Sequence, residues 1–157
     1  MSRNNPAPVL VRTVLPLLAT ALLLTACDFY PVVFDIHVET EDGYNRLDPE
    51  SEYFIGENIS AIYDGQVYPV EILMPTKVYA PRFFGLQLRQ EGMFGYWHLV
   101  FGEFDGAESG EQTVTLVWPD GTSDTIYHKR VVATPLAISD RWKLNGEKCS
   151  SPVVLVK

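Results

Sequence analysis

The chain has 157 residues, with 12 basic and 20 acidic side chains and a formal net charge of −8. Apolar residues make up 46% of it and charged residues 20%, which excludes an intrinsically disordered chain and suits a single folded domain. The acidic balance argues against nucleic acid as a partner, because nucleic-acid-binding surfaces are basic. Two cysteines are too few for the disulfide framework of a small secreted domain.

The first 26 residues have the features of an export signal. Arg3 and Arg12 are the only charged residues before Asp28, so this stretch is positively charged. The apolar run TVLPLLATALLL at 13–24 has 12 residues, whereas a transmembrane helix needs about 20 and the hydrophobic region of a signal peptide about 7 to 15. We therefore expect residues 1–26 to be cleaved off.

The apolar run ends in the sequence Leu24-Thr25-Ala26-Cys27. This sequence resembles the lipobox of bacterial lipoproteins. The resemblance implies that a diacylglyceryl group is joined to the sulfur of Cys27 and that lipoprotein signal peptidase, recognising the three preceding residues, cleaves before it. Two or three acyl chains anchor a protein stably, so we expect the mature chain to be attached to a membrane without spanning it.

Asp28 bears on which membrane carries the anchor. In enterobacterial lipoproteins, Asp directly after the lipidated Cys is associated with retention in the inner membrane, so the resemblance implies that location in a Gram-negative cell. In a cell with one membrane the same protein faces the exterior. Either way the localisation that we expect is extracytoplasmic.

Cleavage before Cys27 leaves 157 − 26 = 131 residues, and the loss of two arginines takes the net charge to about −10. We expect residues 27–31 to be a lipidated tether and residues 32–157 to be one domain. An acidic domain is not attracted to anionic headgroups. The lipid, and not surface charge, is therefore predicted to hold it at the membrane.

The apolar pattern of the mature chain has the period of two that is typical of β-strands. Phe34, Ile36 and Val38 alternate with polar residues and predict a half-buried strand. The acidic, turn-rich sequence EDGYNRLDPESE at 41–52 then predicts a loop.

Residues 59–73 predict a hairpin that turns at Asp64-Gly65. A two-residue turn places these pairs on one face: Tyr63 with Gln66, Ala61 with Tyr68, and Ile59 with Val70, with Ile72 continuing it.

Further short strands follow along the chain. Their signals are Phe84, Leu86 and Leu88 in alternation, the run MFGYWHLVF at 93–101, the face formed by Val114, Leu116 and Trp118, the segment 122–133 after Asp120-Gly121, and the segment 153–156 after a third turn at Asn145-Gly146. Residues 134–144 have room for one short helical turn. Strands at this spacing predict an all-β, antiparallel sandwich or barrel.

The sequence SGEQTVTLVWPDGTSDTIYHKRVVA at 109–133 resembles the terminal hairpin of bacterial immunoglobulin-like domains, with an alternating Thr/Val strand, an Asp-Gly turn and a returning strand. Trp97, on a central strand, suits such a sandwich. The resemblance implies an immunoglobulin-like β-sandwich that lacks the inter-sheet cysteine pair of antibody domains.

Residues that carry chemistry are sparse. His37, His98 and His128 lie far apart, without the spacing of zinc ligands, so they predict no metal site and no cofactor. Nucleophile-elbow and phosphate-loop motifs are missing from the sequence, and it predicts no catalytic residue. Cys149 is expected to be a buried or half-buried thiol, with an intermolecular disulfide as the alternative.

Acidic side chains concentrate around the first predicted loop: Glu39, Glu41, Asp42, Asp48, Glu50, Glu52 and Glu57. Oxygen ligands of this kind suit calcium, but the spacing does not match an EF-hand. We interpret them as a solvated loop.

An aromatic cluster is the best candidate for a binding surface. It comprises Phe83, Phe84, Phe94, Tyr96, Trp97, Phe101 and Phe104. Alternation along 93–101 places Trp97, Leu99 and Phe101 on one face and Phe94, Tyr96, His98 and Val100 on the other. The second face is either covered by the protein itself, which we favour, or exposed as an aromatic platform formed by Phe94, Tyr96 and His98.

Two functions follow from these features. The first is a non-enzymatic binding or structural module of the envelope, whose partner is a protein or a polysaccharide. The alternative is an envelope hydrolase or a carbohydrate-binding domain that uses the strand around Tyr96 to His98.

Overall fold

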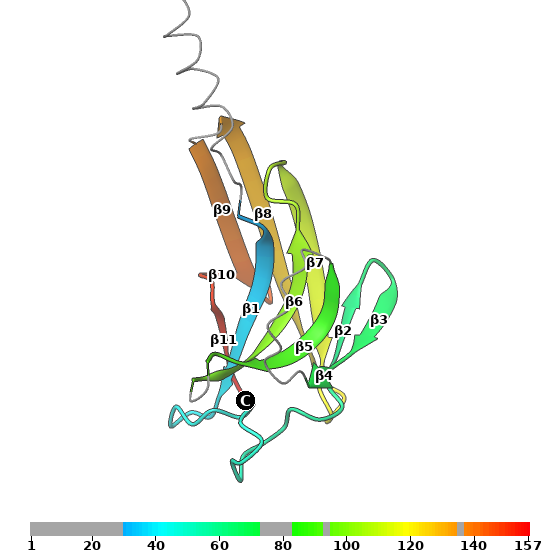
Figure 1. Ribbon diagram of the computed structural model, residues 1–157, viewed down its shortest axis with the longest axis vertical. Helices are drawn as coiled ribbons and strands as arrows, with labels where there is room; N and C mark the ends of the chain where they lie inside the picture. Colours follow the sequence, from blue (N-terminus) through cyan, green and yellow to red (C-terminus); the bar gives the residue numbers. More distant parts are fainter. Residues whose placement is uncertain (1–29, 73–82, 93–94, 135–136) are drawn as a thin grey trace, which may run out of the picture.

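The computed structural model describes residues 30–72, 83–92, 95–134 and 137–157 (Figure 1). The regular secondary structure of these residues consists of strands: β1 Val32–Glu39, β2 Ser60–Tyr63, β3 Gln66–Pro69, β4 Glu71–Ile72, β5 Phe84–Gln90, β6 Trp97–Phe104, β7 Gly110–Val117, β8 Ser123–Thr134, β9 Ala137–Leu144, β10 Glu147–Cys149 and β11 Val153–Val156. In the part of the chain that is described, no helix capable of crossing a membrane is found. The predicted signal peptide and lipobox, residues 1–27, lie outside it.

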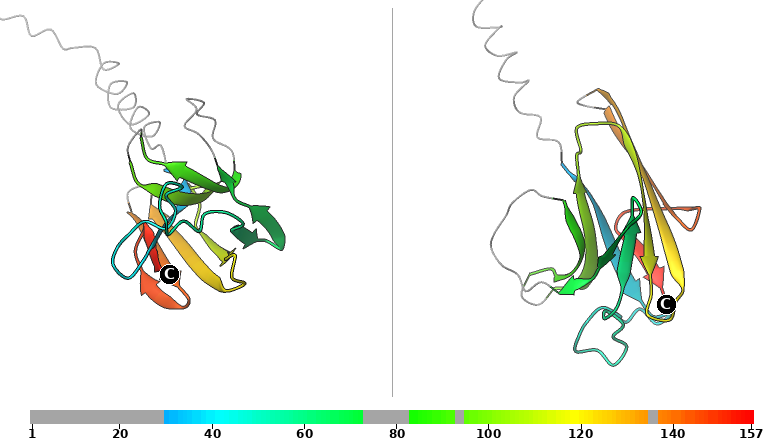
Figure 2. Two further views of the ribbon diagram at one scale, coloured as in Figure 1. Left: turned by 90° about the horizontal axis from the view of Figure 1, so that it is seen from below. Right: turned by 90° about the vertical axis from the view of Figure 1, so that its right-hand side faces the viewer.

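The strands form two sheets that pack face to face (Figure 2). One sheet has the order β11-β1-β6-β5-β4 and the other the order β10-β9-β8-β7-β2-β3. Neighbouring strands are antiparallel except for the pairs β1–β11 and β4–β5, which are parallel. The chain passes between the sheets four times, after β1, β3, β6 and β10. The all-β, sandwich-type architecture predicted from the sequence is confirmed.

The core lies between the sheets and contains the residues that the alternation predicted. On β1, buried and half-buried residues alternate along the whole strand, with Phe34, Ile36 and Val38 fully buried. From the opposite sheet, Val114 and Leu116 are fully buried and Trp118 nearly so. Each large apolar side chain buried in this way contributes about 1.5–3 kcal/mol.

The hairpin turns are the ones that the sequence predicted. Asp64 and Gly65 both have positive φ, 49° and 73°, and Tyr63 pairs with Gln66. A two-residue turn with both φ values positive matches the twist of the flanking strands, and Asp-Gly is a favoured sequence for it. Asn145-Gly146, with φ of 52° and 88°, joins β9 to β10 in the same way.

Two predicted strand faces need correction. Ile72 does not continue the hairpin face, because the chain leaves that sheet after β3 and Ile72 pairs with β5 in the other sheet, where it is half exposed. Phe84 does not share the face of Leu86 and Leu88. The pairing of β5 with β6 shifts register just after Phe84. The centroid of the Phe84 ring lies 4.4 Å from the guanidinium carbon of Arg89.

Two predicted segments also differ from the structure. The short helical turn expected at 134–144 is wrong: residues 137–144 are strand β9, which pairs with β8 along its length. The strand expected at 93–101 runs instead from Trp97 to Phe104. The segment 109–133 does form a hairpin, β7–β8, but β9 continues the sheet beyond it, so the hairpin is internal.

Candidate functional site

The outer face of the five-stranded sheet holds a cluster of polar side chains from two neighbouring strands. We call it the outer-face cluster, and it consists of Asp35, His37 and Glu39 from β1 together with Tyr96, which directly precedes β6, and His98 in β6. The residues between them on β1 point into the core, so the alternation of the strand places the three β1 side chains in a row. Antiparallel pairing of Ile36 with Leu99 then places His98 across from His37.

Asp35 is the centre of this cluster. Its Oδ1 accepts a hydrogen bond from Nδ1 of His98 at 2.8 Å and lies 3.6 Å from Nε2 of His37. The side chains of His98, His37 and Asp35 are 17%, 23% and 35% exposed, so solvent reaches all three. One carboxylate and two imidazoles are therefore brought together on a rigid surface.

Tyr96 holds the side chains of His37 and Glu39 in place within the cluster. Its ring stacks on the imidazole of His37, with centroids 4.7 Å apart, and its hydroxyl donates a 2.9 Å hydrogen bond to Glu39 Oε1. Burial raises the pKa of Tyr96 above its usual value, and the hydrogen bond to the Glu39 carboxylate raises it further. The phenol therefore stays protonated and remains a donor to Glu39 at physiological pH.

Part of this cluster was predicted from the sequence. Tyr96 and His98 were proposed as a binding surface and lie together here, whereas Phe94, the third member, lies outside the described residues. Trp97, Leu99 and Phe101 face the core as predicted, and Val100 on the outer face is nearly buried. The meeting of His37 with His98 was missed, because 61 residues separate them and only the β1–β6 pairing brings them together.

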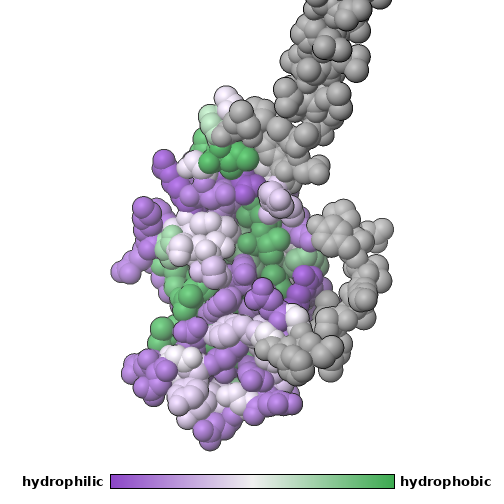
Figure 3. Space-filling model, turned by 60° about the vertical axis from the view of Figure 1, so that its left-hand side comes forward, coloured by the Kyte–Doolittle hydropathy of each residue, from purple (hydrophilic) through white to green (hydrophobic). Residues whose placement is uncertain are grey.

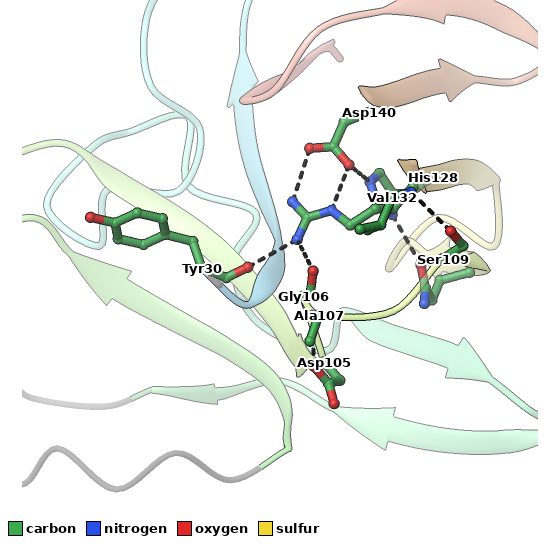
Figure 4. Close-up of polar contacts among 10 residues, drawn as sticks. Tyr30, Asp105, Gly106, Ala107, Ser109, His128, Val132 and Asp140 are labelled. Carbon is green, nitrogen blue, oxygen red and sulfur yellow. Dashed lines mark hydrogen bonds and ion pairs between the residues drawn. The ribbon is translucent and has the colours of Figure 1, made fainter. Parts of the chain in front are cut away.

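A second polar network surrounds Arg130 on β8 (Figure 4). Its guanidinium donates two hydrogen bonds to the Asp140 carboxylate, at 2.8 and 2.9 Å, and others to the carbonyls of Tyr30 and Gly106. Such bidentate pairs fix geometry as well as adding stability. The network attaches the start of the described chain to the β8–β9 hairpin.

His128 belongs to this second network and is fully buried. Its ring nitrogens lie 3.0 Å from Gln112 Oε1 and from Asp140 Oδ1. Burial lowers the pKa of His128, against the opposing effect of the nearby Asp140 carboxylate. An imidazole without solvent contact cannot meet a substrate, so we assign His128 a structural role.

A third polar group, the buried Asp124 near the start of β8, links the segment after β7, the β9–β10 turn and the residue after β11. Its carboxylate accepts hydrogen bonds of 2.6 Å from Trp118 Nε1 and Asn145 Nδ2, and Lys157 Nζ lies 2.6 Å away. Burial acts to raise the pKa of Asp124, but these three partners outweigh it and the pKa is lowered.

The remaining candidates do not form sites. Cys149 is a half-buried free thiol, as predicted, and burial raises its pKa. In the predicted acidic loop, Asp48 caps the backbone N–H of Glu50, and Glu39 bonds Tyr96. Across residues 30–72, 83–92, 95–134 and 137–157, the group of three convergent metal-ligating side chains is Asp35, His37 and His98.

Comparison with protein-family models, with curated proteins and with solved structures finds no match to this chain. Its function therefore has to be argued from its own residues.

Proposed function

We propose that this protein is a lipid-anchored bacterial lipoprotein of the cell envelope, and that its β-sandwich is a non-enzymatic binding module facing the periplasm or the exterior. The observation that carries the proposal is the sequence Leu24-Thr25-Ala26-Cys27 at the end of a signal-like apolar run, followed within five residues by strand β1. We further propose that the sandwich is of the immunoglobulin-like type, which the four chain crossings between its sheets support.

The Arg130 network supports this arrangement because it holds Tyr30, three residues after Cys27, against the β8–β9 hairpin. Arg130 Nη1 donates a 2.9 Å hydrogen bond to the carbonyl of Tyr30. Cys27 is three residues earlier, which is at most about 11 Å of extended chain. A lipid on Cys27 would therefore lie within that reach of Tyr30, and β1 begins alongside the β8–β9 hairpin in Figure 1.

The surface at that end suits a membrane. Val131 on β8 and Ile138 on β9 are 39% and 42% exposed, and apolar side chains gather at this end of the described chain in Figure 3. Thr134 is four residues beyond Arg130, about 13 Å along a strand, so the hairpin reaches as far as the lipid. We propose that this end faces the bilayer and that the opposite, acidic loops face away from it.

The lipid anchor is tested by Cys27→Ser, with Cys149→Ser as the matched control. We expect the wild type and Cys149→Ser to carry a diacylglyceryl mass increment and to partition with membranes, and Cys27→Ser to lose both properties. Intact-mass spectrometry and detergent phase partition provide the two readouts. A wild type without the lipid mass that partitions like Cys27→Ser would refute the anchor.

The binding role is assigned to the outer-face cluster, where Tyr96 and His98 are half-buried on a rigid sheet and reachable by solvent. The alternative, a hydrolase or a carbohydrate-binding domain on the same strand, has one observation in its favour. Asp35, His37 and His98 offer ligand atoms within 4.8 Å of one another, and three such points fit in a circle with a radius of 4.8/√3, or about 2.8 Å.

A further inference from the structure

Three side chains of the outer-face cluster bring their ligand atoms within 4.8 Å of one another. Asp35 and His37 are two positions apart on β1 and therefore project from the same face of the sheet. His98 projects from the adjacent strand β6, beside the paired residues Ile36 and Leu99. All three are carried by paired strands of a packed sheet, and sites built on such elements are held more accurately than sites on loops.

The distances suit a tetrahedral ion. With metal–ligand bonds of about 2.0–2.1 Å, as zinc makes with imidazole nitrogen and carboxylate oxygen, neighbouring ligand atoms lie about 3.3 Å apart. Asp35 Oδ1 lies 2.8 Å from His98 Nδ1 and 3.6 Å from His37 Nε2, values on either side of that separation. The separation of 3.6 Å is too long for a hydrogen bond, so hydrogen bonding to Asp35 does not account for the placement of His37.

Neighbouring side chains hold His37 in this orientation. The ring of Tyr96 stacks on it at an interplanar angle of 28°, and Tyr96 is itself fixed by its hydrogen bond to Glu39. Outer residues that orient ligating imidazoles in this way are a regular part of metal sites. Glu39 also adds a second carboxylate to the cluster, next to Asp35, His37 and His98. The guanidinium of Arg89, a nearby cation, donates a hydrogen bond to Gln87 Oε1 and lies over the Phe84 ring.

We propose that Asp35, His37 and His98 form a binding site for a divalent transition-metal ion of the zinc type. The two imidazoles are borderline nitrogen ligands that select zinc and its transition-metal neighbours over calcium and magnesium, which prefer oxygen ligands alone. Binding replaces the hydrogen bond between Asp35 and His98. The ligating ring nitrogens must carry no proton, so a neutral imidazole moves its proton to the other ring nitrogen and a charged imidazole releases one proton. Three protein ligands leave a coordination position open to water or to a donor group of a partner. This inference is independent of the lipid anchor.

The site is tested on the full chain, extracted from membranes in detergent, made without a polyhistidine tag and stripped with a chelator. Zn²⁺ is titrated against a chromophoric competitor, and Ca²⁺ and Mg²⁺ are added in excess. We expect one equivalent of Zn²⁺ per chain, undisturbed by the two other ions, and a rise in the thermal unfolding midpoint, because an ion bound only by the folded state stabilises it.

The variants His37→Gln, His98→Gln and Asp35→Asn identify the ligands, and Glu147→Gln, an exposed carboxylate on β10, is the control. We expect the three ligand variants to bind Zn²⁺ at least about 100-fold more weakly, since losing even an orienting residue costs about 10- to 100-fold. The control should bind as the wild type does. Near-ultraviolet circular dichroism without metal shows that each variant has folded.

A second measurement needs no variant. Nitrogen–proton correlation spectra of the imidazoles should show Zn²⁺-dependent shifts for two of the three histidine rings and leave the buried ring of His128 unchanged. The proposal is overturned if the wild type binds no stoichiometric Zn²⁺, if it binds only at millimolar concentration, or if all three ligand variants bind as well as the wild type.

Discussion

The buried carboxylate of Asp124 allows the stability of this fold to be tested at a single position. It accepts hydrogen bonds from the indole of Trp118 and the carboxamide of Asn145, and it pairs with Lys157. The substitution Asp124→Asn preserves the shape of the side chain but removes its charge. It also replaces one carboxylate oxygen with an amide NH2 group, a hydrogen-bond donor, at a position where the neighbouring groups need acceptors.

The expected loss of stability follows from these three contacts. A hydrogen bond to a charged group contributes about 1.5–3 kcal/mol and a neutral one about 0.5–1.5 kcal/mol, so removing the charge costs about 1 kcal/mol for each contact. The partly exposed Lys157 pair contributes less. We therefore expect Asp124→Asn to lower the free energy of unfolding by about 2–3 kcal/mol.

Urea unfolding followed by tryptophan fluorescence measures this loss, with Cys27→Ser in every chain so that lipid does not interfere. With a denaturant slope of about 2 kcal/mol per molar, the midpoint should fall by about 1–1.5 M. Glu147→Gln, at an exposed position on β10, is the control and should shift the free energy by less than about 0.5 kcal/mol.

The pH dependence provides a second criterion. The folded-state pKa of Asp124 is lowered below its usual value. Its stabilisation is therefore fully present above the unfolded-state pKa of about 3.9 and is lost as the pH falls through the folded-state pKa. The difference between the wild type and Asp124→Asn should be constant from about pH 5 to 8 and should narrow below about pH 4. An unchanged midpoint, or a difference that persists undiminished in acid, would refute the reasoning.

Two further predictions concern other positions. Gly146→Ala places a Cβ in open space but at a φ of 88°, so left-handed strain alone should lower the free energy of unfolding by about 1 kcal/mol in the same urea assay; an unchanged midpoint would contradict this. Because burial raises the pKa of Cys149, we expect its alkylation by iodoacetamide at pH 8 to be at least about tenfold slower in the native chain than in urea, and equal rates would show that the thiol is exposed.

Local sequence pattern predicted the elements whose signals lie within a few residues. The alternation at Phe34, Ile36 and Val38 and the turn at Asp64-Gly65 depend only on neighbouring residues, and the structure confirms both. The helical turn expected near 134–144 was wrong because extended pairing with β8 overrides a weak local preference. The predicted face of the Phe84 side chain was wrong because a register shift has no local sequence signal.

The candidate site was harder to predict for a related reason. Asp35, His37 and His98 meet through the register of two strands that are distant in sequence, and spacing rules for metal ligands cover only residues on one local element. A D-x-H pattern on the polar face of a predicted strand was the signal available. This pattern indicates a site only when the strand that pairs with it is known.

The parallel pairing of β1 with β11 has a consequence for the order in which the protein folds. Ile36 pairs with Val153, which is 153 − 36 = 117 positions later in the chain. One edge of β1 therefore stays open until the last described strand is available to pair with it. Closing so long a loop is slow, and an open strand edge invites pairing with another chain. A chain that lacks β11 therefore exposes an edge of β1 that is prone to pair with other chains.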